Sequence, residues 1–309
     1  MGDKVNELWG DLYKDVKYRN ERVNYHAMIF IGGCNYEVLI NDFPVDRYFG
    51  PGNGSASGSI PINTAILKSG VQTWKIRIYP VHDSKEVNGK VTMVPRPLIE
   101  DGARVEMDIE GIRFTESGGI EKRFGKVVDF QAPLTNDERT GKKILADHGK
   151  PYVEYTGTFQ ADVPYRLNGW EQGEDLSKLN KDNLEKELLK KYNEYKGWLQ
   201  NGDLDKIAKS KLNAEKEEAQ ALYFNKKLND QYISEFTTSW GRKNITVQPL
   251  ENYSLKFYGD GKVVALISNV YKKSPLWASF KDEESNNNYT IYNLYFYIPK
   301  GKKELEVIR

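Results

Sequence analysis

In the first half of the chain, apolar and polar side chains alternate with the period of a β-strand. Segments 36–40 and 74–79 turn every second side chain to one side, and Asn41-Asp42 and Lys68-Ser69-Gly70 are turn sequences beside them. Such alternation is typical of antiparallel strands with one buried and one solvated face. Further strands are predicted at residues 25–31, 91–94, 105–109, 124–130 and 152–163.

The second half of the chain changes to a helical period. Residues 184–199 carry apolar side chains three and four positions apart, and this stretch ends at Gly202, which suits a left-handed helix cap. Asp203 can cap a second helix that runs to Tyr223, so the two helices form an antiparallel hairpin. Strands are then expected at residues 253–257, 263–267, 291–298 and 305–308.

The length and a change of composition at residues 168–173 predict a multi-domain protein. A chain of 309 residues leaves room for two cores. We place one domain at residues 1–170, with a short amphipathic helix within residues 4–20 that lies against the first sheet. The other domain is residues 171–309, an α+β domain in which the helical hairpin packs on an antiparallel sheet.

Two resemblances give these domains more specific folds. The segment 36–80 resembles jelly-roll or immunoglobulin-like accessory modules of bacterial proteins, in which a strand ending in Asn-Asp or Asn-Gly precedes a Leu-Lys-x-Gly turn and an alternating strand. This resemblance implies an N-terminal antiparallel β-sandwich and no particular activity. The element order of the second half resembles the NTF2-like α+β fold, a cone that often hosts ligands or partners.

The charge balance argues against a polyanionic partner. The 45 basic and 44 acidic side chains leave a formal net charge of +1, so no overall field favours nucleic acid or an anionic membrane. No run approaches the roughly 18 apolar residues of a transmembrane segment. The start, MGDKVNELWG, lacks the apolar region of a signal peptide, which predicts a cytoplasmic location, or a periplasmic or envelope-associated one if a leader was removed.

The sequence offers little for catalysis or for cofactors. Its three histidines, His26, His82 and His148, are at least 56 positions apart and form no metal-binding pair. The glycine-rich loop GPGNGSASG, at 50–58, fits neither phosphate-binding motif, so a flexible loop is favoured over a phosphate site. Cys34 is the only cysteine, and its apolar neighbours favour a buried thiol over a nucleophile. We expect no cofactor, no metal and no enzymatic activity.

An acidic row is the one patterned charge cluster. Glu106, Asp108 and Glu110 point to the same side of a predicted strand. They are either a solvated outer face, which we favour, or a site for a cation or a basic partner. Glu106 and Asp108 are also the weak candidates for a pair of glycosidase carboxylates.

Aromatic residues are the better candidates for a binding surface, because Tyr and Trp are common anchors in protein interfaces. The chain has 20 tyrosines and six tryptophans. Those next to glycine, proline or charged residues are expected to be exposed, and ordinary packing is the alternative for each. These candidates are Tyr48, Phe49, Trp170 and Trp277. Trp74 and Trp198 lie at apolar positions in register and are expected in the core.

These features predict a non-enzymatic binding protein. Chains with little cysteine and much lysine and asparagine resemble proteins encoded beside bacterial secretion systems, including immunity proteins. That resemblance implies another protein as partner, a toxin or a secretion-system component, neutralised by occlusion of its site. A carbohydrate-binding protein of the cell envelope and an enzyme with its site in the C-terminal domain are the alternatives.

Overall fold

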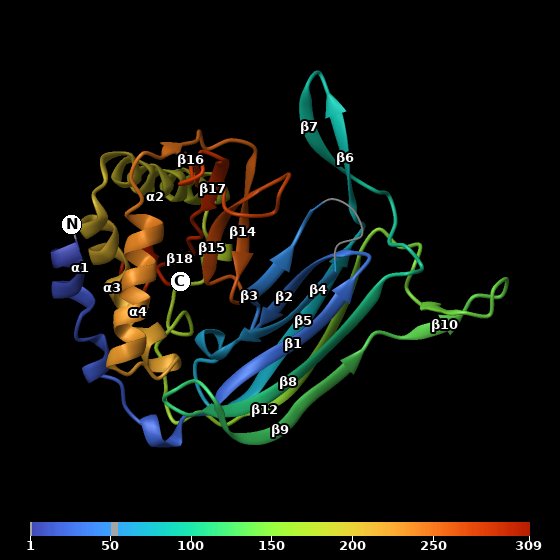
Figure 1. Cartoon of the computed structure of the whole chain (residues 1–309), viewed down its shortest axis with the longest axis horizontal. Helices are drawn as coiled ribbons and strands as arrows, with labels where there is room; N and C mark the ends of the chain where they lie inside the picture. Colours follow the sequence, from blue (N-terminus) through green and yellow to red (C-terminus); the bar gives the residue numbers. More distant parts are fainter. Residues whose placement is uncertain (1, 51–54) are drawn as a thin grey trace. The chain divides into compact units, whose positions relative to one another are not determined.

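The computed structural model describes residues 2–50 and 55–309, which divide into two compact units. Residues 21–166 form one unit, which we call the β unit. Residues 1–20 and 167–309 form the other, which we call the α+β unit. The whole is a β-rich α+β protein of several antiparallel sheets, with its α-helices in the α+β unit (Figure 1). None of the helices in the described part of the chain is long and apolar enough to span a membrane.

The β unit contains two four-stranded antiparallel sheets, in the orders β4-β1-β8-β9 and β12-β5-β2-β3. Two narrow ribbons, β6-β7 and β10-β11, extend from them (Figure 1). The strands are β1 (Asn24–Gly32), β2 (Asn35–Ile40), β3 (Phe43–Tyr48), β4 (Ser55–Pro61), β5 (Gly70–Tyr79), β6 (His82–Val87), β7 (Lys90–Pro95), β8 (Arg104–Phe114), β9 (Ile120–Gln131), β10 (Leu134–Asn136), β11 (Lys143–Leu145) and β12 (Val153–Ala161).

The alternation of buried and exposed side chains predicted for residues 74–79 is confirmed in β5, whereas the one predicted for residues 36–40 is wrong, because every residue of β2 is buried. Asn41 and Asp42 have φ angles of 50° and 59°, the left-handed pair of a tight hairpin between β2 and β3. Every second residue of β5 is buried, and the ring of Trp74 lies 4.9 Å from that of Phe130 in the other sheet. A side chain at Gly157 of β12 would come within 2.6 Å of the Trp74 ring, so glycine leaves room for that ring.

The α+β unit combines four α-helices with a three-stranded and a four-stranded antiparallel sheet. The sheet orders are β13-β16-β17 and β14-β15-β18-β19. The elements are α1 (Gly2–Trp9), α2 (Lys181–Asn201), α3 (Leu204–Ala221), α4 (Lys226–Trp240), β13 (Thr246–Val247), β14 (Tyr253–Tyr258), β15 (Val263–Ser268), β16 (Trp277–Lys281), β17 (Asn287–Ile291), β18 (Phe296–Tyr297) and β19 (Glu306–Val307).

The helices end where the sequence predicts, but their caps and number differ. Gly202 has a left-handed φ of 71° and its N–H donates to the carbonyls of the last turn of α2. Asp203 precedes α3 but makes no side-chain capping bond, and its carboxylate pairs with Lys206 at 2.7 Å. Helix α4 was not predicted, although Asn225 caps it through its side chain.

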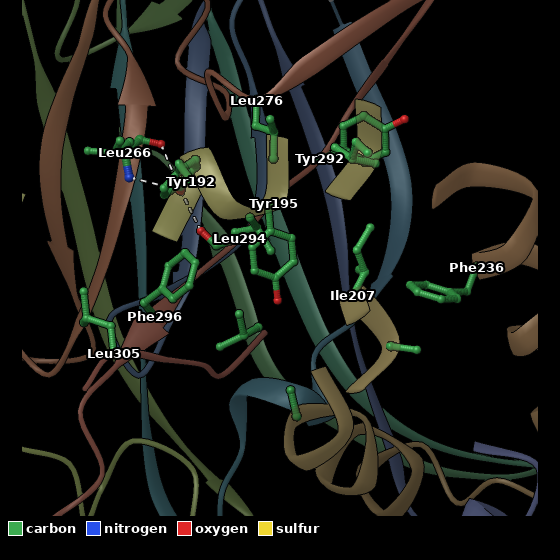
Figure 2. Close-up of a cluster of buried hydrophobic side chains, with 14 of the residues drawn as sticks. Tyr192, Tyr195, Ile207, Phe236, Leu266, Leu276, Tyr292, Leu294, Phe296 and Leu305 are labelled. Atoms are coloured by element: carbon green, nitrogen blue, oxygen red, sulfur yellow. Dashed lines mark hydrogen bonds between the residues drawn. The ribbon is translucent and has the colours of Figure 1, made fainter. Parts of the chain in front are cut away.

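One hydrophobic core takes side chains from all four α-helices and from both sheets of the α+β unit. Figure 2 shows part of this core, in which the hydroxyl group of Tyr192 joins helix α2 to two backbone segments. The hydroxyl donates to the carbonyl of Leu294 at 3.0 Å and accepts from the amide of Leu266 at 3.1 Å. These bonds satisfy the buried hydroxyl and fix the helix relative to the strands.

The predicted position of the N-terminal helix is wrong. Helix α1 belongs to the α+β unit, where the indole N–H of Trp9 donates to the carbonyl of Ala208 at 3.1 Å. The side chain of Asn229 donates to the carbonyl of Trp9 at 3.0 Å, and the ring of Phe236 lies 4.2 Å from its indole. The helix therefore packs on α3 and α4.

The long aromatic strand predicted at residues 291–298 is also wrong. Strand β17 ends at Ile291, and β18 contains only Phe296 and Tyr297. Between them Tyr292 and Leu294 are almost fully buried in the core. The run therefore leaves one sheet and enters the other.

Candidate binding groove

The structure separates the four aromatic candidates. Tyr48, at the end of β3, is half-buried and its ring stacks near Tyr36, with 6.4 Å between ring centroids. Exposure of Phe49 was expected, but only 8% of this residue is exposed, and its ring packs 5.2 Å from Tyr79 and 6.2 Å from His82. The expectation for Phe49 is wrong because these rings cover it.

Trp170 was also expected at the surface, but only 4% of it is exposed. It packs against the turn after β14, where a side chain at Gly259 would come within 2.8 Å of the indole. The guanidinium of Arg309 lies 5.5 Å from the ring centre, at cation–π distance. Trp170 is therefore a core residue, and Trp277 is the candidate with the most exposed surface.

Trp277 lines a groove of about 510 Å³ in the α+β unit. The exposed fractions are 37% for Trp277, 49% for Tyr271 and 59% for Tyr289, and all three residues line this groove. The other lining residues are Gln248, Pro249, Glu251, Asn252, Ser268, Val270, Lys273, Ser274, Pro275 and Ile291. The groove therefore combines exposed rings with apolar and amide side chains.

The register of the three-stranded sheet places the side chains of Trp277 and Tyr289 on one face. Trp277 is opposite Ile291, and Ser279 is opposite Tyr289. Side chains at alternate positions of a strand point the same way, so Trp277 shares its face with Ser279 and both partners. The next residue, Ala278, points to the core. One face of this sheet is thus buried, and the other carries the aromatic groove.

A closed turn after β15 holds Tyr271 at the groove. The hydroxyl of Ser268 accepts from the amides of Val270 and Tyr271, each at 3.3 Å. The amide of Ser268 donates to the carbonyl of Lys273 at 2.7 Å, and Lys272 has a left-handed φ of 53°. These bonds satisfy the backbone of the turn and leave the tyrosine ring to the solvent.

Polar and charged groups also line the groove. The amide nitrogen of Gln248 donates to the hydroxyl of Ser279 at 3.0 Å and to the carbonyl of Thr246 at 3.1 Å, so both of its hydrogens are used within the sheet. Glu251 and Lys273 are the ionisable groups of opposite charge that line the groove. The histidines of the chain all belong to the β unit.

The acidic row on β8 is neutralised by neighbouring cations. Asp108 pairs with Lys126 at 2.7 Å, and Glu110 pairs with Arg123 at 2.5 Å. The third acid, Glu106, pairs with its strand neighbour Arg104 at 2.9 Å. Within residues 2–50 and 55–309, no group of three His, Cys, Asp or Glu side chains is arranged to hold a metal ion.

Cys34 and the glycine-rich loop were the other candidate sites in the sequence, and the described residues do not support a site at either. Cys34 is buried as predicted, and burial raises the pKa of its thiol to about 12, so it is protonated at neutral pH. The flexible loop expected at residues 50–58 is wrong for residues 55–58, which pair with β1, and residues 51–54 lie outside the described residues. Ser55 already belongs to β4.

A buried polar cluster joins helices α3 and α4. Lys211 pairs with Glu215 at 2.9 Å, and the hydroxyl of Tyr232 donates to the other oxygen of Glu215 at 2.6 Å. Burial raises the pKa of Glu218 to about 7, and the neighbouring carboxylate of Glu215 adds to this effect. This cluster lines neither this groove nor a second, more charged one beside α2.

Sequence reasoning missed Tyr271 and Tyr289. Tyr271 follows Asn269 and precedes two lysines, and Tyr289 follows three asparagines, so both stand in the polar context that marked Trp277. The rule based on glycine, proline or charged neighbours selects Tyr271, which lysines follow, but not Tyr289, whose neighbours are Asn288 and Thr290. No protein-family model, curated protein or solved structure matches the chain.

Proposed function

We propose that this chain is a non-enzymatic binding protein that recognises another protein through the aromatic groove. The observation that carries the proposal is that Tyr271, Trp277 and Tyr289 lie in one groove although more than a third of each is exposed. Exposed rings that gather at one place mark binding surfaces more often than isolated ones do. Trp and Tyr are also the residues most enriched among the energetic anchors of protein interfaces.

The surroundings of the rings fit a protein partner. Pro249, Pro275 and Ile291 add apolar surface, and Gln248 and Asn252 add amide groups. This combination resembles an interface hot spot, in which apolar anchors are enclosed by polar groups that keep water out. A single acid and a single base at the groove give it no strong preference for a charged ligand.

The partner class and the folds belong to the same proposal. The composition supports a role beside a bacterial secretion system, with a toxin as the partner and occlusion of the toxin's site as the mechanism. The β unit is proposed to be a β-sandwich, since rings from its two sheets meet at Trp74 and Phe130. The α+β unit is proposed to be NTF2-like, because its helices share a core with antiparallel sheets.

The test uses the full chain and the purified product of a gene next to its own, measured by biolayer interferometry. The wild type is expected to bind with a Kd of micromolar or lower. The double variant Trp277→Ala/Tyr289→Ala should bind about 100-fold more weakly, as loss of two anchors predicts. Phe30→Ala is the matched control, because Phe30 is 49% exposed in the β unit. Equal binding by both variants would contradict the proposal.

Carbohydrate binding is the second candidate. The observation that favours it is that the groove combines the exposed indole of Trp277 with the amide side chains of Gln248 and Asn252. An aromatic face can stack on a sugar ring while the amide oxygen accepts a sugar hydroxyl. A glycan array separates the two functions, because a protein-binding chain should give no signal on it. A signal that Trp277→Ala removes would favour the sugar.

A further inference from the structure

The outer edge of β17 carries backbone groups that face away from its own sheet. β17 is the last strand in the order β13-β16-β17. The amide of Tyr292 donates to the carbonyl of Leu276 at 2.9 Å, and that of Asp282 donates to the carbonyl of Asn286 at 3.0 Å. These bonds lie at the two ends of the β16–β17 ladder and fix which of its pairs are hydrogen-bonded.

Hydrogen-bonded and non-hydrogen-bonded pairs alternate along an antiparallel ladder. When the alternation is counted inward from those two bonds, the backbone groups of Thr290 and Asn288 are hydrogen-bonded to β16. The backbone groups at the positions between and beside them, Asn287, Tyr289 and Ile291, are not. The N–H and C=O groups of these three residues therefore point outward. Their side chains lie on the same face as Trp277, because Trp277 is opposite Ile291. The amide of Tyr289 donates to the side-chain oxygen of Asn288 at 3.0 Å, a local bond that an added strand would have to replace.

This edge differs from the other long edges of the protein. Charged residues, prolines and bulges are the usual means by which edge strands avoid pairing with other chains. β9 carries Lys122, Arg123 and Lys126, and its pairing with β8 has three register shifts. β3 contains Pro44. The sequence of β17, NNYTI, has neither a charged residue nor a proline.

We propose that an extended peptide segment of the partner protein pairs with β17 as an additional strand and places every second side chain in the aromatic groove. This inference rests on the proposed function, since it names the part of the partner that the groove receives. Backbone pairing supplies the affinity and the groove supplies the selectivity, as in other cases of strand addition. The segment needs apolar or aromatic side chains at alternate positions, because rings and aliphatic groups line the groove.

A peptide fits this edge better than a second copy of the chain. β17 has five residues, which span about 17 Å at roughly 3.4 Å per residue. Two such strands side by side bury much less than the roughly 1,200 Å² of a stable interface. A flexible segment can pair with the strand and also enter the groove beside it, so it uses both surfaces.

The experiment selects binders from a phage-displayed library of random linear 12-residue peptides on the full chain. Enriched peptides are expected to alternate apolar and polar residues and to bind with micromolar Kd. Methylating single peptide amides should weaken binding at least tenfold at every second position and little at the positions between, because only alternate amides face β17. Hydrogen exchange of residues 287–291 should slow when the peptide binds.

Ile291→Pro and Ile291→Val are the protein variants. Proline removes an outward-facing N–H at an edge, where proline is tolerated, whereas valine keeps it. We expect Ile291→Pro to bind at least tenfold more weakly than Ile291→Val. Should the proline variant fail to fold, the methylation series and the exchange data decide the matter on the wild-type chain.

The outcomes separate this inference from the proposed function. Peptides that lose affinity to Trp277→Ala but show no alternation on methylation and no slowed exchange in β17 overturn strand pairing and leave the groove as the binding site. Binding that Trp277→Ala and Ile291→Pro both leave unchanged overturns the inference and the groove together. A dimer in sedimentation experiments that Ile291→Pro dissociates would make a second copy the occupant and overturn the peptide.

Discussion

Two sheet faces of this protein are exposed in different ways. The outer face of β8 carries Asp108 and Glu110, and each is paired with a cation of the next strand. The outer face of the β13-β16-β17 sheet carries Trp277 and Tyr289, whose rings stay in contact with solvent. The acids of the charged face are paired with cations of the same sheet, whereas the rings of the aromatic face remain exposed and can be covered by a partner.

The difference shows why the more conspicuous sequence pattern was the poorer indicator of a site. From the sequence alone an acidic row resembles a cation-binding site. The strand beside it provides cations that pair with the acids, so little negative charge remains to attract a ligand. Exposed rings gain little from neighbours on their own sheet face. When a partner covers these rings, their apolar surface is removed from water, and this burial contributes favourably to the free energy of binding.

The largest expected effect contrasts a buried tryptophan with the exposed one in the same unit. Trp9→Ala should lower the free energy of unfolding by about 3–5 kcal/mol, because it removes a fully buried indole and its hydrogen bond to Ala208. Trp277→Ala should lower it by less than about 1 kcal/mol. Urea unfolding measures both. A large loss of unfolding free energy in Trp277→Ala would mean that this side chain stabilises the core and does not form a free binding surface.

The next prediction compares the two faces in binding. Removing Trp277 and Tyr289 should cost about 2–4 kcal/mol of binding free energy to the partner protein, as loss of hot-spot residues does. Asp108→Asn together with Glu110→Gln should change it by less than about 0.5 kcal/mol. Titration calorimetry on both double variants measures the contrast. A larger effect on the charged face would reverse the comparison.

The third prediction concerns Glu218, a buried carboxyl group that lies beside a second carboxylate, Glu215. Burial and the adjacent Glu215 raise the pKa of Glu218 to about 7, above its usual value near 4.5. The folded chain therefore holds this proton more tightly than the unfolded chain does, and stability falls as the pH rises from about 4.5 through 7.

Glu218→Gln should remove that decline. At pH 8 the variant should be more stable than the wild type by roughly 1–3 kcal/mol, and at pH 4.5 the two should be nearly equal. Thermal unfolding across this pH range measures the effect. Parallel pH profiles for wild type and variant would show that the pKa of Glu218 is not raised. Glu217→Gln, one position away, is the control.

The smallest effect concerns one ion pair of the charged face. Lys126→Met should lower the free energy of unfolding only slightly, because half of the lysine side chain is exposed and water screens its pair with Asp108. The difference should shrink in 1 M salt. A loss as large as that of Trp9→Ala, unchanged by salt, would mean that more than screened charges stabilises this sheet face.

Much of the local structure could be predicted from short-range patterns. The sequence pattern located most of the longer strands of the β unit but missed β4, β6, β10 and β11. Asn41-Asp42 located a hairpin, and Gly202 located the end of α2. The errors arose at Phe49 and Trp170, which glycines and charges surround in the sequence but which other segments cover in space. Neighbours along the chain report a residue's local conformation and not its burial.

The amino-acid sequence by itself determined where strands alternate, where turns reverse and where helices end, because these depend on residues a few positions apart. Only the tertiary structure decided that Trp9 packs against Ala208, 199 positions away, and that three aromatic residues from separate segments share a groove. The physical reason is that burial and strand register are set by contacts between distant segments, and many pairings of those segments are compatible with the same local pattern.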